Sequence, residues 1–187
     1  MGIEIEVKFR LADPAAIREK VLSAGAEAIG KVLEENTYFD TSDARLRQSD
    51  CGLRIRTVRP LDGGSGRSTL TYKGPRRAGE LKIRTEEETA IDSPAAAREI
   101  LSALGYKATV SFQKRRESFR LGAARIELDE LPGLGFFMEI EADDEKTVQA
   151  ARKILDLTGG PTITKTYVEI VAEHLVAETK ETDVLRF

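Results

Sequence analysis

Charged and apolar residues alternate along several short segments, and this alternation constrains the fold more than any other feature of the sequence. In GIEIEVKFRL (residues 2–11), every second residue from Glu4 to Arg10 is ionised and the residues between them are apolar. Successive side chains of a β-strand point to opposite faces, so such a segment predicts a strand with one charged face. The further predicted strands are TYFDT (37–41), GLRIRTVR (52–59), STLTYKG (68–74), ELKIRTEEETAI (80–91), TVSFQKRRESFRL (109–121), ARIELDEL (124–131) and GFFMEIEA (135–142).

Four helices are predicted between or after these strands. The first covers about residues 13–24 and the second about 93–104, and each has a capping residue, then Pro, and Gly just after its end. The third starts near residue 143 or 144, and the fourth covers about residues 166–180. Antiparallel hairpins combined with separate helices indicate an α+β fold.

Length and composition indicate one globular domain. The 187 residues, 41% of them hydrophobic, are enough to bury a core. We expect a single domain over residues 1–187, with a core of about 2–176 and a tail, 177–187, that docks on the barrel or on a partner. The 29 basic and 32 acidic residues leave a net charge of −3, which gives no reason to expect a nucleic acid or a membrane as partner. With a single cysteine, no apolar run as long as a membrane span and no signal-like amino terminus, we expect a cytoplasmic protein.

The charged strand faces have two interpretations. An antiparallel sheet often shows one face to water, which would leave these residues solvated. The acidic and basic residues nevertheless sort by strand, which a solvated face does not require. If about eight strands close into a barrel instead, the charged faces enclose a space just wide enough for side chains or one small ligand. Such a lining persists only if its charges pair or meet a charged ligand, and a polyphosphate with a divalent metal ion satisfies both signs.

The segment EIEVK resembles the E-x-E-x-K signature of the CYTH superfamily, the triphosphate tunnel metalloenzymes named after class IV adenylyl cyclases and thiamine triphosphatases. The resemblance extends from Glu4 to about Tyr167 and includes, in the family's order, LRIR, YKGP, KIRTE, KRRESF, IELDELPGLGFFMEIE and KTYVEI. It implies the CYTH fold, an eight-stranded antiparallel β-barrel or tunnel with helices packed outside. It also implies Mg²⁺ or Mn²⁺ as cofactor.

Carried over residue by residue, the resemblance implies two sets of functional side chains. The metal-binding carboxylates would be Glu4, Glu6, Asp129, Glu139, Glu141 and Glu127. The triphosphate would be held by Lys8, Arg54, Arg56, Lys73, Lys82, Arg84, Lys114, Arg116 and, near the tunnel mouth, Lys165. The alignment leaves open which of Arg54 and Arg56 takes the family position. The expected catalytic residues are Lys8, Arg56, Lys114 and Arg116, whereas Arg115 alternates away from them and is expected outside.

The resemblance leans towards a class IV adenylyl cyclase, which would convert ATP to cyclic AMP and pyrophosphate. Attack by the ribose 3′-hydroxyl on the α-phosphorus gives these products, whereas attack by water on the terminal phosphorus makes the enzyme a triphosphatase. Hydrolysis of tripolyphosphate or of a nucleoside or thiamine triphosphate is therefore the alternative. A module that binds a nucleotide or polyphosphate without turnover is a third hypothesis. In each case the partner is a small-molecule triphosphate, and the resemblance also allows a homodimer.

Overall fold

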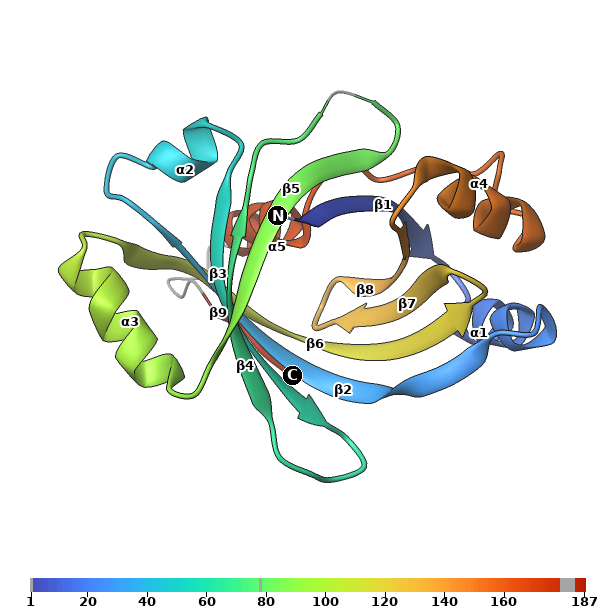
Figure 1. The fold of residues 1–187 in the computed structure, drawn as a ribbon, viewed down its shortest axis with the longest axis horizontal. Helices are drawn as coiled ribbons and strands as arrows, with labels where there is room; N and C mark the ends of the chain where they lie inside the picture. Colours follow the sequence, from blue (N-terminus) through green and yellow to red (C-terminus); the bar gives the residue numbers. More distant parts are fainter. Residues whose placement is uncertain (1, 78, 179–183) are drawn as a thin grey trace.

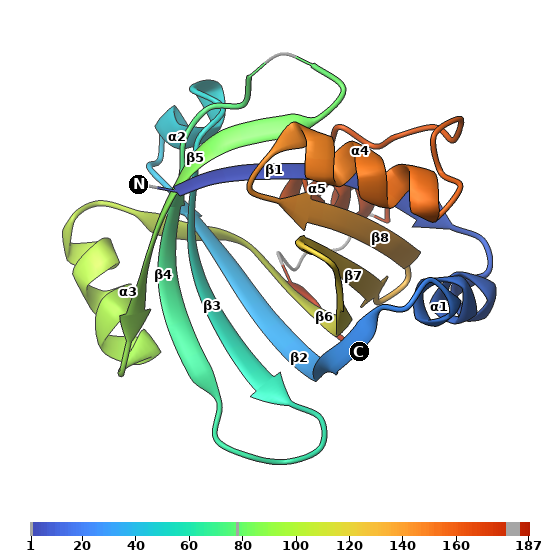
Figure 2. The same ribbon diagram turned by 45° about the vertical axis from the view of Figure 1, so that its right-hand side comes forward.

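The alternating segments form one antiparallel sheet that closes on itself. The computed structural model describes residues 2–77, 79–178 and 184–187, and Figures 1 and 2 show the strands encircling a common interior. The strand order is β2-β3-β4-β5-β1-β8-β7-β6, and pairing of β2 with β6 closes the barrel. The predicted eight-stranded antiparallel barrel is thereby confirmed. Its strands are β1 (Gly2–Leu11), β2 (Glu27–Asp40), β3 (Gly52–Pro60), β4 (Arg67–Lys73), β5 (Lys82–Ile91), β6 (Lys107–Leu121), β7 (Ala124–Leu131) and β8 (Gly135–Ala142).

Strand β2 is much longer than the segment predicted over residues 37–41, because it already begins at Glu27. The alternation fails before Thr37: Val32 and Leu33 are adjacent apolar residues, and two adjacent glutamates follow them. The strand is held by its neighbours instead, because it pairs with β3 on one side and with β6 on the other. A register shift between Ala28 and Gly30 in the pairing with β6 further disturbs the periodicity.

The four predicted helices are present and lie outside the barrel (Figure 2). They are α1 (Pro14–Ser23), α3 (Pro94–Ala103), α4 (Glu145–Ile154) and α5 (Tyr167–Ala177). Each begins after a residue whose side-chain oxygen accepts a hydrogen bond from a backbone N–H of the first turn: Asp13, Ser93, Asp144 and Thr166. Helix α5 ends at Ala177, before the predicted end near Lys180, which lies outside the described residues.

Two short elements were not predicted. Helix α2 (Arg45–Gln48) begins after Asp40, whose carboxylate accepts hydrogen bonds from the backbone N–H groups of Leu46 and Arg47 at 2.9 and 3.0 Å. Strand β9 (Val184–Leu185) pairs in parallel with β6 at the end of the chain. The described part of the tail therefore docks on the barrel.

The hydrophobic core lies between the barrel wall and the helices, and the barrel interior is polar. Val7 of β1, Ile126 of β7 and Ile140 of β8 are almost fully buried against Val21 of α1 and Val148 of α4. A second cluster packs α5 on β6, β7 and β8. Since the apolar faces are turned towards the helices, the charged faces of the same strands are turned inward. No helix in the described part of the chain has both the length and the apolar character that crossing a bilayer requires.

Candidate active site in the barrel interior

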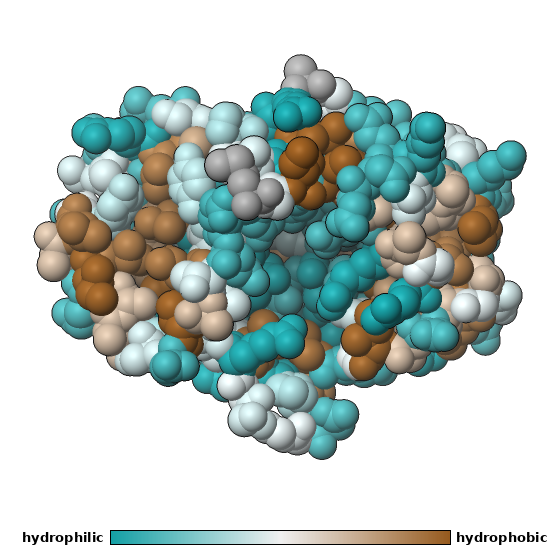
Figure 3. Space-filling model, in the orientation of Figure 1, coloured by the Kyte–Doolittle hydropathy of each residue, from teal (hydrophilic) through white to brown (hydrophobic). Residues whose placement is uncertain are grey.

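The barrel encloses a charged cavity of about 1300 Å³. Figure 3 shows hydrophilic side chains gathered around a hollow in the middle of the molecule. Among the described residues, 14 Lys or Arg and 13 Asp or Glu side chains line this cavity. The interior therefore has many ionised groups but almost no net charge, and it is larger than an ordinary small-molecule pocket of about 300–1,000 Å³.

The structure brings most of the predicted site residues together on this lining. The cations that line the cavity are Lys8, Arg54, Arg56, Lys73, Lys82, Arg84, Lys114 and Arg116. The predicted carboxylates that line it are Glu4, Glu6, Glu127, Glu139 and Glu141. Arg54 and Arg56 face inward together, because they are two residues apart on β3. Arg115 points outward, as expected, and its side chain is bound to Glu130.

Two predicted site residues, Lys165 and Asp129, do not line the cavity. The side chain of Lys165 is 55% exposed and forms an ion pair of 2.7 Å with Glu173 at the edge of the cavity. Asp129 is almost fully buried behind the lining and accepts a hydrogen bond from the Tyr167 hydroxyl at 2.7 Å. Because its Oδ2 also accepts from Lys114 at 3.1 Å, the carboxylate is positioned to hold protein cations in place.

Strands β1, β4, β5 and β8 bring lysines and carboxylates of the interior into direct contact. The Lys73 ammonium donates a hydrogen bond to a Glu4 carboxylate oxygen at 2.6 Å. Lys82 forms an ion pair with Glu6, and the Lys8 Nζ lies 3.2 Å from a carboxylate oxygen of Glu139. Burial, with a contribution from Lys82, lowers the pKa of Lys8 to about 8, although Glu139 opposes the shift. Burial also disfavours the charged form of Lys82, but Glu6 and Glu139 raise its pKa above the usual value. These ion pairs compensate the buried charges of the interior, which would otherwise destabilise the folded protein.

One carboxylate of the interior lacks a cationic partner. Glu141 forms no hydrogen bond or ion pair with the described residues; it lies opposite Glu6 in the β1–β8 pair, with Glu4 of β1 and Glu139 of its own strand nearby. Burial and the repulsion of these three carboxylates raise the pKa of Glu141 to about 7. In this side-chain arrangement no three acidic, His or Cys residues of the described chain converge closely enough to enclose an ion. The excess of negative charge around Glu141 and the oxygen donors nevertheless suit Mg²⁺ or Mn²⁺ chemically.

Arg116 lies at the centre of a buried network. Its Nη2 is 2.6 Å from both Asp129 and Glu139, and its Nε is 3.6 Å from Glu127. Burial opposes the charged form, but Asp129 and Glu127 raise the pKa of Arg116 well above its usual range. The Tyr167 ring lies under the Lys8 ammonium, 3.8 Å from the ring centroid. Helix α5 thereby contributes a side chain to the interior and fixes the position of the cations.

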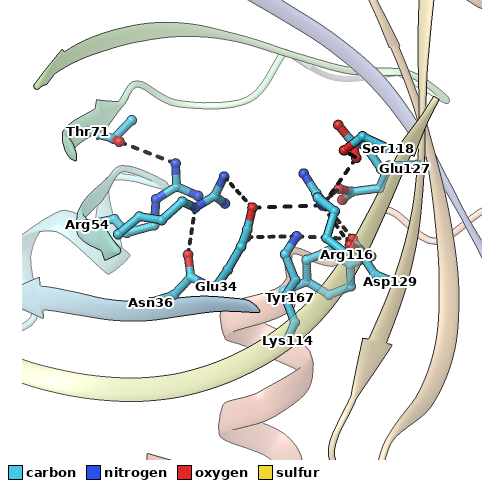
Figure 4. Close-up of polar contacts among 12 residues, drawn as sticks. Glu34, Asn36, Arg54, Thr71, Lys114, Arg116, Ser118, Glu127, Asp129 and Tyr167 are labelled. Atoms are coloured by element: carbon cyan, nitrogen blue, oxygen red, sulfur yellow. Dashed lines mark hydrogen bonds and ion pairs between the residues drawn. The ribbon is translucent and has the colours of Figure 1, made fainter. Parts of the chain in front are cut away.

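Glu34 is an interior residue that the sequence analysis missed. Its side chain lies between the β3 and β6 cations (Figure 4), 3.3 Å from Arg56, 3.4 Å from Lys114 and 4.0 Å from Arg116. Burial would raise the pKa of Glu34, but these three cations together hold it well below the usual range. Alternation counted backwards from Tyr38 along β2 would have placed Glu34 on the inner face. Glu86 and Glu88 of β5 also line the cavity without having been assigned a role.

Comparison with known proteins gives matches that extend over most of the barrel. The CYTH domain profile matches residues 2–167. A Methanocaldococcus jannaschii protein that carries a provisional adenylate cyclase name is 29% identical over 177 residues, which are 90% of this chain and 98% of that protein. Adenylate cyclase CyaB of Aeromonas hydrophila is 32% identical over 155 residues, 81% of this chain and 76% of that protein. A solved structure from Pyrococcus horikoshii has a TM-score of 0.80 and 32% identity, and the match covers 91% of this chain and 99% of that one.

Proposed function

This chain belongs to the CYTH domain family, and from that premise we propose that it is a metal-dependent adenylyl cyclase that converts ATP to cyclic AMP and pyrophosphate inside the barrel. The observation that carries the proposal is the convergence of eight cations and the β1 and β8 carboxylates on one cavity. Cations of this kind recognise phosphate oxygens, and carboxylates recognise Mg²⁺ or Mn²⁺. The likeness to adenylate cyclase CyaB favours ATP among the triphosphates.

The charge balance of the cavity supports dependence on a divalent metal ion. The lining is almost neutral, with 14 cationic and 13 acidic side chains among the described residues. A triphosphate carries about four negative charges, and burying it there would leave most of them uncompensated. Glu4, Glu6, Glu139 and Glu141 would hold the ion or ions, which would neutralise phosphate charge as the leaving group departs. Glu127 stands beside this set as a further candidate ligand.

The protein's own cations bind and orient the phosphate chain. Lys73 and Lys82 extend from β4 and β5, and Lys114 and Arg116 extend from β6, so phosphate oxygens can be contacted from opposite walls. Asp129 acts as a positioning residue, because it holds Lys114 and Arg116 from behind. The ribose 3′-hydroxyl then loses its proton to water, and its oxygen bonds to the α-phosphorus while the bond from that phosphorus to the bridging oxygen breaks and pyrophosphate leaves. Positioning and charge stabilisation dominate phosphoryl-transfer catalysis.

Hydrolysis of a triphosphate is the second candidate function. The eight cations recognise phosphate oxygens and not a base, and the cavity is large enough for water to reach the terminal phosphate. Product analysis distinguishes the two activities. With ATP and Mn²⁺ the protein should release cyclic AMP and pyrophosphate in equal amounts. Free phosphate from ATP or tripolyphosphate without cyclic AMP would establish a triphosphatase, and tight binding without products would establish a binding module.

A pair of variants on β3 tests the cavity as the site. Arg56→Gln should lower kcat/KM by about 10²–10³, the typical effect of losing one donor to developing charge. Arg59→Gln is the matched control, because Arg59 lies on the same strand but faces outward, where it pairs with Glu35. An Arg56→Gln enzyme with the kcat/KM of the Arg59→Gln enzyme would exclude the barrel interior as the site.

A further inference from the structure

Two inward-facing residues of β2 have buried polar atoms without hydrogen-bond partners. Glu34 Oε2 and Asn36 Nδ2 accept or donate no hydrogen bond among the described residues, although the two side chains are 3% and 1% exposed. Glu34 Oε2 has only an ion-pair contact there, with Lys114 Nζ at 3.4 Å. Neither was assigned a role from the sequence. Natural proteins rarely leave buried polar atoms without partners, so such atoms need an explanation. Figure 4 shows both side chains beside Arg54, with Glu34 reaching towards Lys114 and Arg116 of the neighbouring strand β6.

The charge of Glu34 makes it unsuitable for contact with phosphate. Its carboxylate lies within ion-pair distance of Arg56 and Lys114, so it competes with phosphate oxygens for the same cations. A carboxylate accepts hydrogen bonds only, and its matching ligand group is a donor such as a hydroxyl. Since Glu34 adjoins the phosphate-binding cations directly, the group that reaches it is one bonded next to the phosphate chain.

Asn36 holds one of the cations beside this acceptor. Its Oδ1 accepts a hydrogen bond from Arg56 Nε at 2.9 Å. Glu34 and Asn36 are two residues apart on one face of β2, but of the two only Glu34 lines the cavity. A ligand in the cavity therefore reaches the Glu34 carboxylate, and Asn36 positions Arg56 next to it.

We propose that Glu34, which lines the cavity, recognises the ribose of a nucleoside triphosphate by accepting hydrogen bonds from the sugar hydroxyls, while Asn36 positions Arg56 beside it. The inference rests on the proposed function, because it assumes a triphosphate on the neighbouring cations. It makes Glu34 a specificity residue: its charge favours a substrate with a hydroxylated sugar beside the α-phosphate and disfavours polyphosphate alone. Glu34 thus works against the triphosphatase activity on inorganic substrates that the cations alone would allow.

Calorimetric titration of the full chain with Mg²⁺ tests the proposal, using ATP, 2′,3′-dideoxy-ATP and tripolyphosphate as ligands. The wild-type protein should bind ATP at least tenfold more tightly than dideoxy-ATP, since a hydrogen bond to a charged group contributes about tenfold to a hundredfold in affinity. In Glu34→Gln this ratio should fall to about threefold or less, and tripolyphosphate should bind about tenfold more tightly. Glu35→Gln is the matched control: Glu35 is the next residue on β2, faces outward and pairs with Arg59.

The outcomes separate this inference from the proposed function. If no triphosphate binds to the wild-type protein, the proposed function fails and the inference fails with it. If all three ligands bind but the wild-type protein does not distinguish ATP from dideoxy-ATP, the ribose contact is refuted alone. The same conclusion follows if a folded Glu34→Gln protein keeps the wild-type ratio. The wild-type comparison stands by itself should the variant fail to fold.

Discussion

Removing the hydroxyl of Tyr167 should destabilise the protein by an amount that follows from its contacts. The hydroxyl donates to Asp129 Oδ2 at 2.7 Å in a buried position. Burial, and then the Asp129 charge, raise the pKa of Tyr167 well above 10, so it remains a donor at neutral pH. A hydrogen bond to a charged group contributes about 1.5–3 kcal/mol. Tyr167→Phe keeps the ring against Phe137 and Lys8, and Asp129 keeps its cationic partners, so we expect a loss of about 2 kcal/mol.

Urea unfolding followed by circular dichroism at pH 7 measures this loss. About 2 kcal/mol corresponds to a shift of about 1 M in the urea midpoint at a slope of about 2 kcal/mol/M. The same loss should lower Tm by about 4–8 °C in a chain of this size. Tyr72→Phe is the control, because Tyr72 is 41% exposed and its hydroxyl donates only to Cys51 Sγ; it should cost less than about 0.5 kcal/mol. A Tyr167→Phe protein with the wild-type midpoint would refute the proposed coupling of α5 to the interior network.

Three further predictions concern the metal, its ligands and the acid sensitivity of the fold. Glu6→Gln should lower metal-dependent turnover by at least about 100-fold while circular dichroism remains that of a folded barrel; turnover within threefold of wild type would remove Glu6 from the metal site. Chelation with EDTA should abolish product formation, and excess Mg²⁺ or Mn²⁺ should restore it; activity that persists after exhaustive chelation and dialysis would contradict metal dependence. Arg76→Met should lower stability by about 1 kcal/mol or less at pH 7, because the carboxylates of Asp50 and Glu169, which Arg76 pairs with, are partly exposed. Against the opposing effect of burial, Arg76 lowers the pKa of both carboxyls, so its contribution is fully present at neutral pH and decreases as the pH falls from about 4 through the lowered pKa values. Urea melts at pH 7 and pH 3.5 should show a smaller difference at pH 3.5.

The sequence predicted the barrel because its strands carry their charges at a strict period of two. From Lys82 to Glu88 and from Lys114 to Ser118, every second side chain is polar and faces the interior of the structure. The capping residues before α1 and α3 were equally informative, because a short polar side chain followed by Pro defines a helix start locally. These features depend on neighbours in the sequence, so they can be recognised without the fold.

Features that depend on the partners of a strand could not be predicted in the same way. The part of β2 before Thr37 is held by hydrogen bonds to β3 and β6, and the sequence did not show that the strand extends back to Glu27, so Glu34 was not assigned to the interior. The sequence placed Asp129 among the metal-binding carboxylates. It could not show that the Tyr167 hydroxyl, from a helix distant in sequence, donates a hydrogen bond to one oxygen of Asp129. Pairing between charged residues is decided by the register of the closed sheet, which a single sequence does not contain.

Two of the strand pairings in the barrel join segments that are far apart in the sequence, and this affects how the chain can fold. The β2–β6 pairing joins Glu27 with Arg120, and the β1–β8 pairing joins Lys8 with Glu139. Contacts between residues so distant in the chain are slow to form, because the entropy of a long loop must be lost first. Until β8 has been synthesised, one edge of the first strand stays unpaired and can template association with other chains. Slow synthesis or reduced temperature should therefore favour soluble protein during expression.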